Sequence, residues 1–231
     1  MNSASESALY VYAVCRLPEA GLTLPLGIER ETVLVAVDGM AAIAEPGLDL
    51  EALQADDQRL LTAVLTHDRV IFDLFNQTTL LPLRFGIQLA SLESLEKHLR
   101  ENLEPYRQRL VELADKVEYQ VKLTPAEITL PPLSEGLTGR DYFLAKKTRL
   151  QEQTAEQQRQ QEALDSLVAT IRDAYPEVRT RHSEEGIPRL YLLLERDQSE
   201  QLLHTAETWQ RQTPHWHIGL SEALPPYHFV S

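Results

Sequence analysis

Seven histidines are the side chains of this 231-residue chain with the widest scope for chemistry near neutral pH, as metal ligands or as bases. His215 and His217 stand two residues apart in a predicted strand, which places both imidazoles on one face. A zinc site normally needs a third protein ligand, and no carboxylate or cysteine stands at ligand spacing nearby. We therefore expect no metal and no cofactor, and instead two partly exposed histidines that flank Trp216.

His67 is the other histidine that could act as a base. It lies three residues after Val64 and four before Ile71, at the border of an apolar helix stripe. Arg84 is the one residue that the sequence offers as its partner in a catalytic site, and no third catalytic residue can be named. We predict that His67 is a structural residue at the edge of the core, hydrogen-bonded to backbone or to a carboxylate.

The usual signatures of catalysis are also missing from the sequence. The nine glycines are scattered singly, so none forms a phosphate-cradling loop, and no HExxH, GxSxG or CxxC pattern occurs. Cys15 is the single cysteine and follows the apolar run Leu9–Val14, which indicates a small buried side chain rather than a nucleophile. We therefore predict that the protein is not an enzyme and has no catalytic residue.

The stretch Leu80–Phe85 alternates apolar residues like a strand but contains a proline and an arginine. Pro82 cannot donate a ladder hydrogen bond, which places it at a sheet edge or a bulge. Arg84 either pairs with an internal carboxylate or serves as a site for an anion or a partner, and we favour the ion pair. The candidate partner-binding residues are Leu81, Pro82, Leu83, Arg84, Phe85 and Gly86.

An N-terminal α+β domain over residues 1–116 is predicted to position His67 and Arg84. Apolar runs rich in β-formers predict its strands, and capped amphipathic runs predict its helices. The predicted strands are Leu9–Cys15, Thr32–Val37, Met40–Ala44 and Leu80–Phe85. The predicted helices run from Asp56 or Asp57 to Phe75 and from Ser91 to Lys116.

Residues 117–231 are predicted to form a second, ferredoxin-like domain in the order strand, helix, two strands, helix, strand. The predicted strands are Glu118–Leu123, Val178–His182, Pro188–Leu194 and His215–Leu220, with the middle two joined at Glu184–Gly186. The predicted helices are Gly139–Tyr175 and Ser199–Arg211, and prolines at 125, 131 and 132 mark a linker. The fold class is therefore α+β in two domains, each with helices and a sheet.

Two segments of this second half have unusual composition. Gln151–Gln161 contains six glutamines and a single apolar residue, so the helix is polar all round there. Such a helix projects into solvent, and we favour a solvated spacer over an arm that contacts a partner. The tail Leu224–Ser231 carries Tyr227 and Phe229, so we predict that it is docked, as part of the region 117–231, rather than free as a polyproline-II ligand.

Composition narrows the class of protein. The chain is 43% hydrophobic and 25% charged, an ordinary globular balance. Its net charge of −13 argues against nucleic acid or an anionic membrane as the main partner. No apolar run approaches the roughly 18 residues of a membrane-spanning helix, and no signal peptide is recognised at the N-terminus. We expect a cytoplasmic protein.

Three blocks of the N-terminal half resemble the gas vesicle protein family GvpF/GvpL. The strand Leu9–Tyr12 is similar to the family's opening Tyr-Val-Tyr strand, and His67 matches a histidine on the following helix. Leu81–Gly86 is similar to the family's Pro-hydrophobic-Arg-Phe-Gly segment. The resemblance is greatest to the cyanobacterial GvpF type.

Two blocks of the C-terminal half extend the resemblance. The run Arg140–Leu144, with Tyr142, resembles the family's Gly-Arg-x-Tyr-Leu helix start. The tail is similar to its terminal Gly-Pro-Trp-Pro-Pro-Tyr-Ser-Phe element, with matches at Pro225, Pro226, Tyr227 and Phe229. Glu222-Ala-Leu replaces Gly-Pro-Trp and His228 replaces Ser, so the surface against which the tail docks stays open.

The resemblance implies a minor gas vesicle protein of the cytoplasm. Its implied partners are the small, hydrophobic shell subunit GvpA and other minor gas vesicle proteins, with neither nucleic acid nor membrane among them. It would bind GvpA and support vesicle assembly, or form a structural part of the vesicle, without catalysing a reaction. The alternative from another class is a ligand-sensing regulatory protein built on a ferredoxin-like module.

Overall fold

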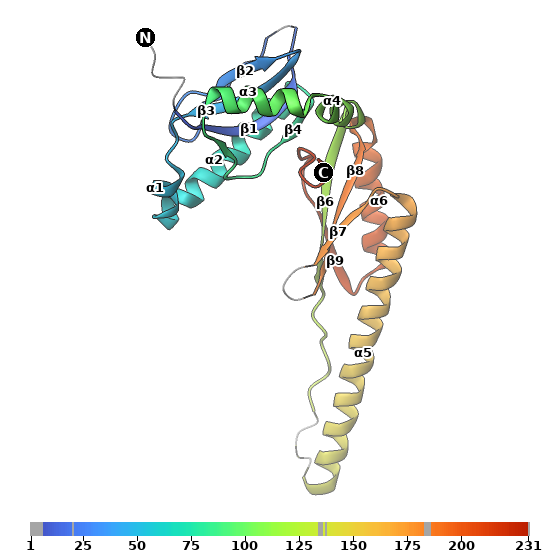
Figure 1. Ribbon diagram of the computed structural model, residues 1–231. Helices are drawn as coiled ribbons and strands as arrows, with labels where there is room; N and C mark the ends of the chain where they lie inside the picture. Colours follow the sequence, from blue (N-terminus) through green and yellow to red (C-terminus); the bar gives the residue numbers. More distant parts are fainter. Residues whose placement is uncertain (1–6, 20, 134–135, 137, 183–185, 231) are drawn as a thin grey trace. The chain divides into compact units, whose positions relative to one another are not determined.

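The computed structural model describes residues 7–19, 21–133, 136, 138–182 and 186–230 (Figure 1). The chain divides into two compact units. The first unit is the chain up to Glu118 together with the C-terminal segment from Ala223, and the second unit is Tyr119–Glu222. Both units mix helices with an antiparallel sheet ladder, in agreement with the predicted class of mixed helices and strands.

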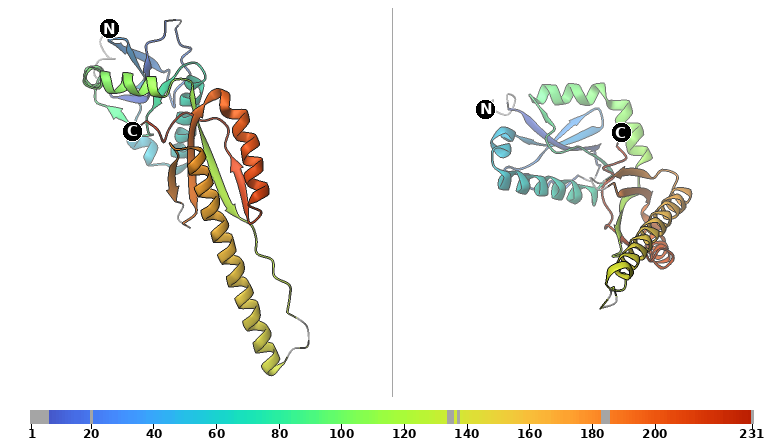
Figure 2. Two further views of the ribbon diagram at one scale, coloured as in Figure 1. Left: turned by 90° about the vertical axis from the view of Figure 1, so that its right-hand side faces the viewer. Right: turned by 90° about the horizontal axis from the view of Figure 1, so that it is seen from below.

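The first unit is a sheet covered by helices. Its strands are β1 (Leu9–Arg16), β2 (Val33–Val37), β3 (Met40–Pro46), β4 (Leu80–Pro82) and β5 (Gln88–Leu89). Its helices are α1 (Leu50–Gln54), α2 (Asp57–Phe75), α3 (Leu92–Glu101) and α4 (Leu103–Glu112). The strand order is β2-β3-β1-β4, and β5 also pairs with β1. Figure 2 shows α2 and α3 on opposite faces of this sheet.

The central strand β1 explains the nearly unbroken apolar run at the N-terminus. Every residue from Leu9 to Cys15 is at most 3% exposed, because β1 is paired along both edges and covered on both faces. Cys15 is 0% exposed, which confirms the predicted buried side chain, and this burial raises the pKa of its thiol to about 11. The turn Asp38-Gly39 joins β2 to β3 with positive φ at both residues, as a two-residue hairpin requires.

The structure differs from the prediction for the first unit at two breaks. The strand expected over Leu80–Phe85 ends at Pro82, and the chain then leaves the sheet. The helix expected from Ser91 to Lys116 is divided at Asn102 into α3 and α4. Pro105 accounts for the second break, because it cannot donate to the carbonyl of Glu101 and its ring clashes with that carbonyl.

The second unit has the predicted order of elements. They are β6 (Lys116–Pro125), α5 (Gly139–Ala174), β7 (Arg179–His182), β8 (Pro188–Glu195), a 3-10 turn (Arg196–Gln198), α6 (Ser199–Gln212) and β9 (Trp216–Leu220). The strand order is β7-β8-β6-β9. The predicted junction Glu184–Gly186 between β7 and β8 falls largely outside the described residues.

Helix α5 is 36 residues long, or about 54 Å at 1.5 Å per residue. Its buried side chains, Leu164, Leu167 and Ile171, all lie in its last third, where it packs on the sheet. The first half extends beyond the sheet, beside the chain that leads into it from β6 (Figures 1 and 2). Most side chains of the polar stretch 151–161 are exposed, in keeping with the predicted solvated spacer.

Gln160 anchors α5 at the end of that polar stretch. Its side-chain amide donates to the carbonyls of Ala126 (2.9 Å) and His215 (3.0 Å). Its own backbone carbonyl accepts from the indole N–H of Trp216 at 2.8 Å.

None of the helices within the described residues is both long enough and apolar enough to span a bilayer.

Candidate functional site

A buried aromatic cluster lies beneath the Pro-Leu-Arg-Phe-Gly segment. Tyr10 and Tyr12 are two residues apart on β1 and therefore share a face of the sheet. His67 approaches from α2 and Phe85 from the chain after β4, with ring centroids 5.0 to 5.8 Å apart. We call these four residues the His67 cluster.

His67 uses both of its ring nitrogens inside the protein. Its Nε2 lies 3.1 Å from the carbonyl oxygen of Leu83, which can only accept, so Nε2 carries the proton. The neutral ring then accepts the hydroxyl hydrogen of Tyr10 at Nδ1, over 2.8 Å. His67 is 2% exposed, and burial lowers its pKa. The predicted hydrogen bond between His67 and backbone is therefore observed, and both ring nitrogens are engaged within the protein.

The segment Leu83–Gly86 forms a short loop that β1 holds at both ends. The backbone N–H of Leu83 donates to Tyr12 O, and that of Val11 donates to Ile87 O, each over 2.9 Å. The Gly86 N–H donates to the Tyr10 hydroxyl at 3.3 Å, with Gly86 at φ +93°, a conformation that favours glycine. We call Leu83–Gly86 the Arg84 loop.

Arg84 is exposed on this loop, and it forms no hydrogen bond or ion pair with any residue in the described part of the chain. The expected buried ion pair with a carboxylate is therefore wrong. The reason is that β4 ends at Pro82, so Arg84 does not lie on a packed sheet face. A hydrated guanidinium needs no internal partner, whereas a buried one would.

The structure divides the six predicted partner-binding residues into two groups. Leu81 and Pro82 are buried and belong to the core. Arg84 and Gly86 are exposed, while Leu83 and Phe85 are half-buried. Strand addition at this edge is disfavoured, because β4 has three residues and one of them is a proline without an N–H.

The sequence reading missed Glu45, the best-satisfied buried charge of the first unit. Glu45 is 0% exposed at the end of β3. Its carboxylate accepts a hydrogen bond from the hydroxyl of Tyr12. It also accepts from the backbone N–H groups of Ile28, Glu29 and Arg30, over 2.7 to 2.8 Å. The sequence signal was a lone acidic residue that closes the apolar run Met40–Ala44.

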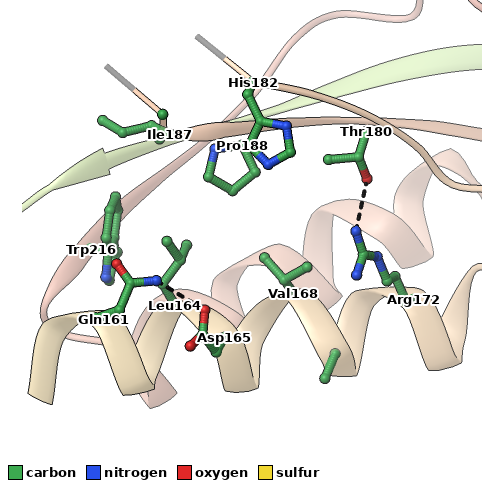
Figure 3. A pocket seen from close by; sticks show the side chains of 12 residues that line it. Gln161, Leu164, Asp165, Val168, Arg172, Thr180, His182, Ile187, Pro188 and Trp216 are labelled. Carbon is green, nitrogen blue, oxygen red and sulfur yellow. Dashed lines mark hydrogen bonds between the residues drawn. The ribbon is translucent and has the colours of Figure 1, made fainter. Parts of the chain in front are cut away.

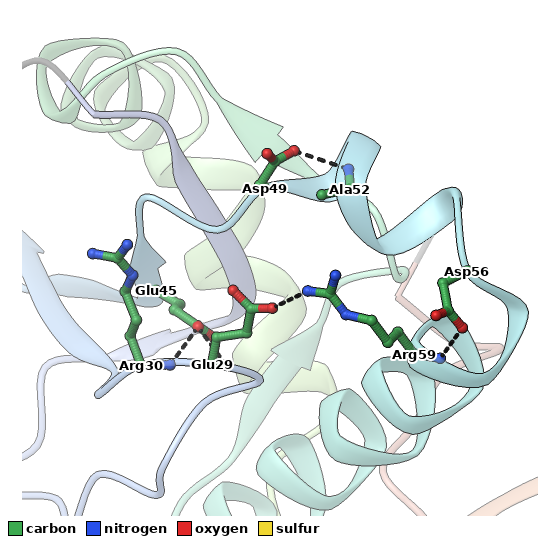
Figure 4. A network of polar contacts seen from close by, with 7 residues as sticks. All are labelled: Glu29, Arg30, Glu45, Asp49, Ala52, Asp56 and Arg59. Atoms are coloured by element: carbon green, nitrogen blue, oxygen red, sulfur yellow. Dashed lines mark hydrogen bonds and ion pairs between the residues drawn. The ribbon is translucent and has the colours of Figure 1, made fainter.

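This Glu45 network ties the loop before β2 to the sheet (Figure 4). A Cβ atom at Gly27 would clash with Glu45 Oε2, so the loop can approach the carboxylate only because glycine is there. At the surface, Glu29 pairs with Arg59 at 2.7 Å, and Asp49 and Asp56 cap the helices that follow. The network orders backbone, and both oxygens of the Glu45 carboxylate accept hydrogen bonds within the protein.

The C-terminal tail belongs to the first unit, which answers the open question of the surface against which it docks. Its buried residues are Pro225, Pro226 and Phe229. Glu118, which is 0% exposed, accepts from the backbone N–H and from Nδ1 of His228 at 2.8 and 2.7 Å. The hydroxyl of Tyr227 donates to Asp68 at 3.4 Å. His228, where the tail departs from the family pattern, thus supplies part of its anchor.

The remaining predicted residues lie in the second unit. Trp216 is buried, and of the histidines beside it His217 is exposed and His215 is half-buried. Tyr142 is exposed near the start of α5, far along the chain from the residues of the Arg84 loop. Across the described ranges, no three His, Cys, Asp or Glu side chains gather closely enough to hold a metal ion.

An open cavity of about 470 Å³ lies between α5 and the strands β7 and β8 (Figure 3). Four of its polar lining groups bond in pairs: Gln161 donates to Asp165 at 2.9 Å, and Arg172 donates to Thr180 at 3.3 Å. Leu164, Val168 and Pro188 supply its apolar wall. Among the described residues that line it, no hydrogen bond joins the histidine, His182, to the carboxylate, Asp165.

The buried state of His67 predicts a pH effect. Burial lowers its pKa in the folded protein below the unfolded value of about 6.5, so on acidification the unfolded chain takes up the proton first. The stability that neutral His67 contributes is therefore present above pH 6.5 and is lost as the pH falls below it. A His67→Gln variant keeps a donor and an acceptor but does not titrate. We expect urea unfolding, followed by circular dichroism, to show that the wild type loses stability more steeply toward pH 5 than His67→Gln does. Equal losses in the two proteins would contradict this role of the neutral His67 ring.

Comparison with known proteins identifies the family to which this chain is similar. The family model described as gas vesicle synthesis protein GvpL/GvpF matches residues 8–231. Gas vesicle protein F of Streptomyces sp. (strain CB03234) is 26% identical over 241 aligned positions, which cover 96% of this chain and 98% of the relative.

Two crystal structures share the fold. The gas vesicle protein GvpF from Anabaena sp. PCC7120 superposes with a TM-score of 0.69 at 18% identity, over 97% of this chain and 98% of that one. GvpF from Microcystis aeruginosa gives a TM-score of 0.68 at 19% identity, over 97% and 99%. Because the family model covers nearly the whole chain, including the Arg84 loop, the His67 cluster and the docked tail, this chain belongs to the gas vesicle GvpL/GvpF family.

Proposed function

We propose that this protein binds the hydrophobic shell subunit GvpA through the Arg84 loop, and so supports gas vesicle assembly or forms a structural part of the vesicle. Family membership supports a gas vesicle role. The observation that carries the choice of surface is the exposure of Arg84 on a loop whose backbone is fixed from below by Tyr10 and His67. The action would take place in the cytoplasm, at the growing or finished vesicle.

The physical case for the loop is preorganisation. Ordering a loop on binding costs conformational entropy, and a loop already held by β1 avoids most of that cost. Arginine and aromatic residues dominate the energetics of protein interfaces. Arg84 supplies five donors and Phe85 a half-buried ring beside it, so an apolar partner with a few exposed carbonyls or carboxylates would be complementary.

A role without catalysis is consistent with the chemistry of the described residues. His67, Glu45 and Glu118 are the buried groups that could move protons, and each has its hydrogen-bonding atoms engaged within the protein. A general base must instead reach the proton of a substrate. The proposal therefore assigns these residues to holding the loops and the tail.

We also propose that the second unit is a ferredoxin-like module and that the two units are separate domains. In the order β7-β8-β6-β9, the strands flanking α5 are separated by β8, and those flanking α6 are separated by β6. Two interleaved βαβ units of this kind characterise the split-βαβ topology. The boundary would lie within β6, with the tail returning to the first domain.

The test of function is capture of GvpA by wild type and by Arg84→Ala, with Arg16→Ala as the matched control. Both arginines are exposed residues of the first unit. We expect Arg84→Ala to leave the free energy of unfolding within about 0.5 kcal/mol of wild type, because no internal partner is lost. We expect it to weaken GvpA binding about tenfold or more, as an interface arginine does, while Arg16→Ala binds normally.

If Arg84→Ala and Arg16→Ala bind GvpA equally well, the Arg84 loop is not the surface that contacts GvpA. If folded wild-type protein never captures GvpA and cells without it make normal vesicles, the assembly role is wrong. A small-molecule thermal shift combined with no GvpA capture would instead favour the ligand-sensing alternative.

A further inference from the structure

The exposed first three turns of α5, residues 139–150, combine apolar and basic side chains; we call this segment the α5 tip. Phe143 is 72% exposed and Leu150 is 63% exposed. They are seven residues apart, or two helical turns, and so lie on one side of the helix. Lys146 and Lys147 stand between them at i+3 and i+4 and flank the same stripe.

The opposite side of the α5 tip is already occupied by its own chain. Ala145 and Arg149 are half-buried there, and the guanidinium of Arg149 donates to the carbonyl of Pro131 at 3.0 Å. The stripe of Phe143 and Leu150 therefore faces away from the returning chain. Large apolar side chains held in water mark an interaction surface, and the lysines beside them form no ion pair with a residue that the structure describes.

The charge of the α5 tip is opposite to that of the protein as a whole. Its twelve residues carry four basic side chains and one acidic side chain, whereas the whole chain has a net charge of −13. An acidic, apolar face is therefore the complementary partner, and the chain itself carries one. On α2, Leu61 (61% exposed) and Leu65 (62% exposed) form an apolar pair one turn apart.

Two aspartates bracket that pair on the same side of α2. Asp57 stands four residues before Leu61, and Asp68 stands three residues after Leu65, so both lie over the leucines. Both aspartates are exposed. The α2 face thus offers apolar contacts with acidic ends, and the α5 tip offers apolar contacts with basic neighbours.

We infer that the α5 tip of one copy of this protein docks on the Leu61/Leu65 face of α2 in a second copy. The contact is heterologous, because two different surfaces meet, so each copy can bind two others and form an open chain. Two turns of helix bury far less than the roughly 1,600 Å² of a standard stable interface, so the association is weak and reversible. The inference does not depend on GvpA binding.

Sedimentation velocity of the full chain over a wide concentration range tests this directly. We expect the weight-average mass to rise with concentration at low salt and to fall back at high salt, because exposed charge pairs are screened beyond about 10 Å at 0.1 M. A Lys146→Glu/Lys147→Glu variant should weaken self-association about tenfold or more. The control Lys97→Glu/Lys122→Glu makes the same change in net charge at exposed lysines elsewhere and should associate like wild type.

A charge-swap mixture supplies the specific proof. The Asp57→Lys variant, which leaves the hydrogen bond between Tyr227 and Asp68 in place, should also self-associate more weakly than wild type, yet it should associate when mixed with Lys146→Glu/Lys147→Glu, because opposite charges meet again. A Leu61→Ser/Leu65→Ser variant repeats the test on α2 without altering charge, and circular dichroism checks that each variant is folded. A wild type that stays monomeric at every concentration overturns the inference. So does association that survives in the lysine variant, or binding of the tip to phosphatidylserine vesicles without self-association.

Discussion

Replacing Glu45 with alanine is expected to destabilise the first unit by about 3–5 kcal/mol. The change removes the acceptor of the Tyr12 hydroxyl and of three backbone N–H groups, from Ile28, Glu29 and Arg30. Each buried donor left without a partner costs about 1–3 kcal/mol, and water entering the space would recover part of that cost. Glu45→Gln should be intermediate, because its amide keeps one acceptor oxygen but turns a donor toward other donors.

The measurement is urea unfolding followed by two probes. Both tryptophans, Trp209 and Trp216, lie in the second unit, so tryptophan fluorescence reports on that unit, whereas far-ultraviolet circular dichroism reports on both. Glu45→Ala should lower the urea midpoint of the first unit, which is seen by circular dichroism. The midpoint of the second unit, which is seen by tryptophan fluorescence, should stay unchanged. The matched control is Glu29→Ala, which removes an exposed carboxylate worth about 0–1 kcal/mol through its surface pair with Arg59. Equal effects of the two substitutions would refute the role assigned to Glu45.

Phe229→Ala should cost about 3–5 kcal/mol, the usual range for truncating a buried phenylalanine. Phe229 is 2% exposed although it lies two residues from the end of the chain. Its burial depends on the anchor formed by Glu118, which exchanges backbone hydrogen bonds with Leu224 at 2.8 and 2.9 Å and binds His228 through its side chain. Loss of the ring should therefore release the tail as well as weaken the core.

Limited proteolysis separates these two consequences. In Phe229→Ala the tail should be removed at a protease concentration that leaves the wild-type tail intact, and the dichroism midpoint should fall. Val230→Ala is the control, because Val230 is half-exposed and its truncation should change stability by less than about 1 kcal/mol. If Phe229→Ala melts like wild type and keeps a resistant tail, the docking described above contributes no stability.

Prediction from the sequence succeeded where local forces decide the outcome. The run Leu9–Cys15 is rich in β-formers and became the buried strand β1, and Asp38-Gly39 formed the hairpin turn that its composition predicts. Helix α5 begins at Gly139 as expected and ends one residue earlier than expected, ahead of Pro176. In each case the residue types within a short segment already favour the observed element, so a pattern of a few residues is enough to predict it.

Prediction failed where a side chain's environment depends on distant segments. Arg84 was expected to be buried because a strand was extended through it, and the early end of β4 at Pro82 left it in water instead. The short elements α1 and β5 were not anticipated, since five and two residues carry little periodicity. The surface against which the tail docks stayed open from the sequence, because its anchor, Glu118, lies 110 positions before His228 in the chain.

The sequence by itself determined the types and order of most elements, the absence of a recognisable catalytic motif and the family resemblance. Only the tertiary structure decided which groups satisfy one another. Glu45 meets Ile28 across 17 positions, His67 meets Tyr10 across 57, and Glu118 meets His228 across 110. The physical reason is that burying a polar group is costly unless a partner is present. The chain therefore adopts the packing that supplies those partners, and residue spacing along the sequence does not reveal which packing that is.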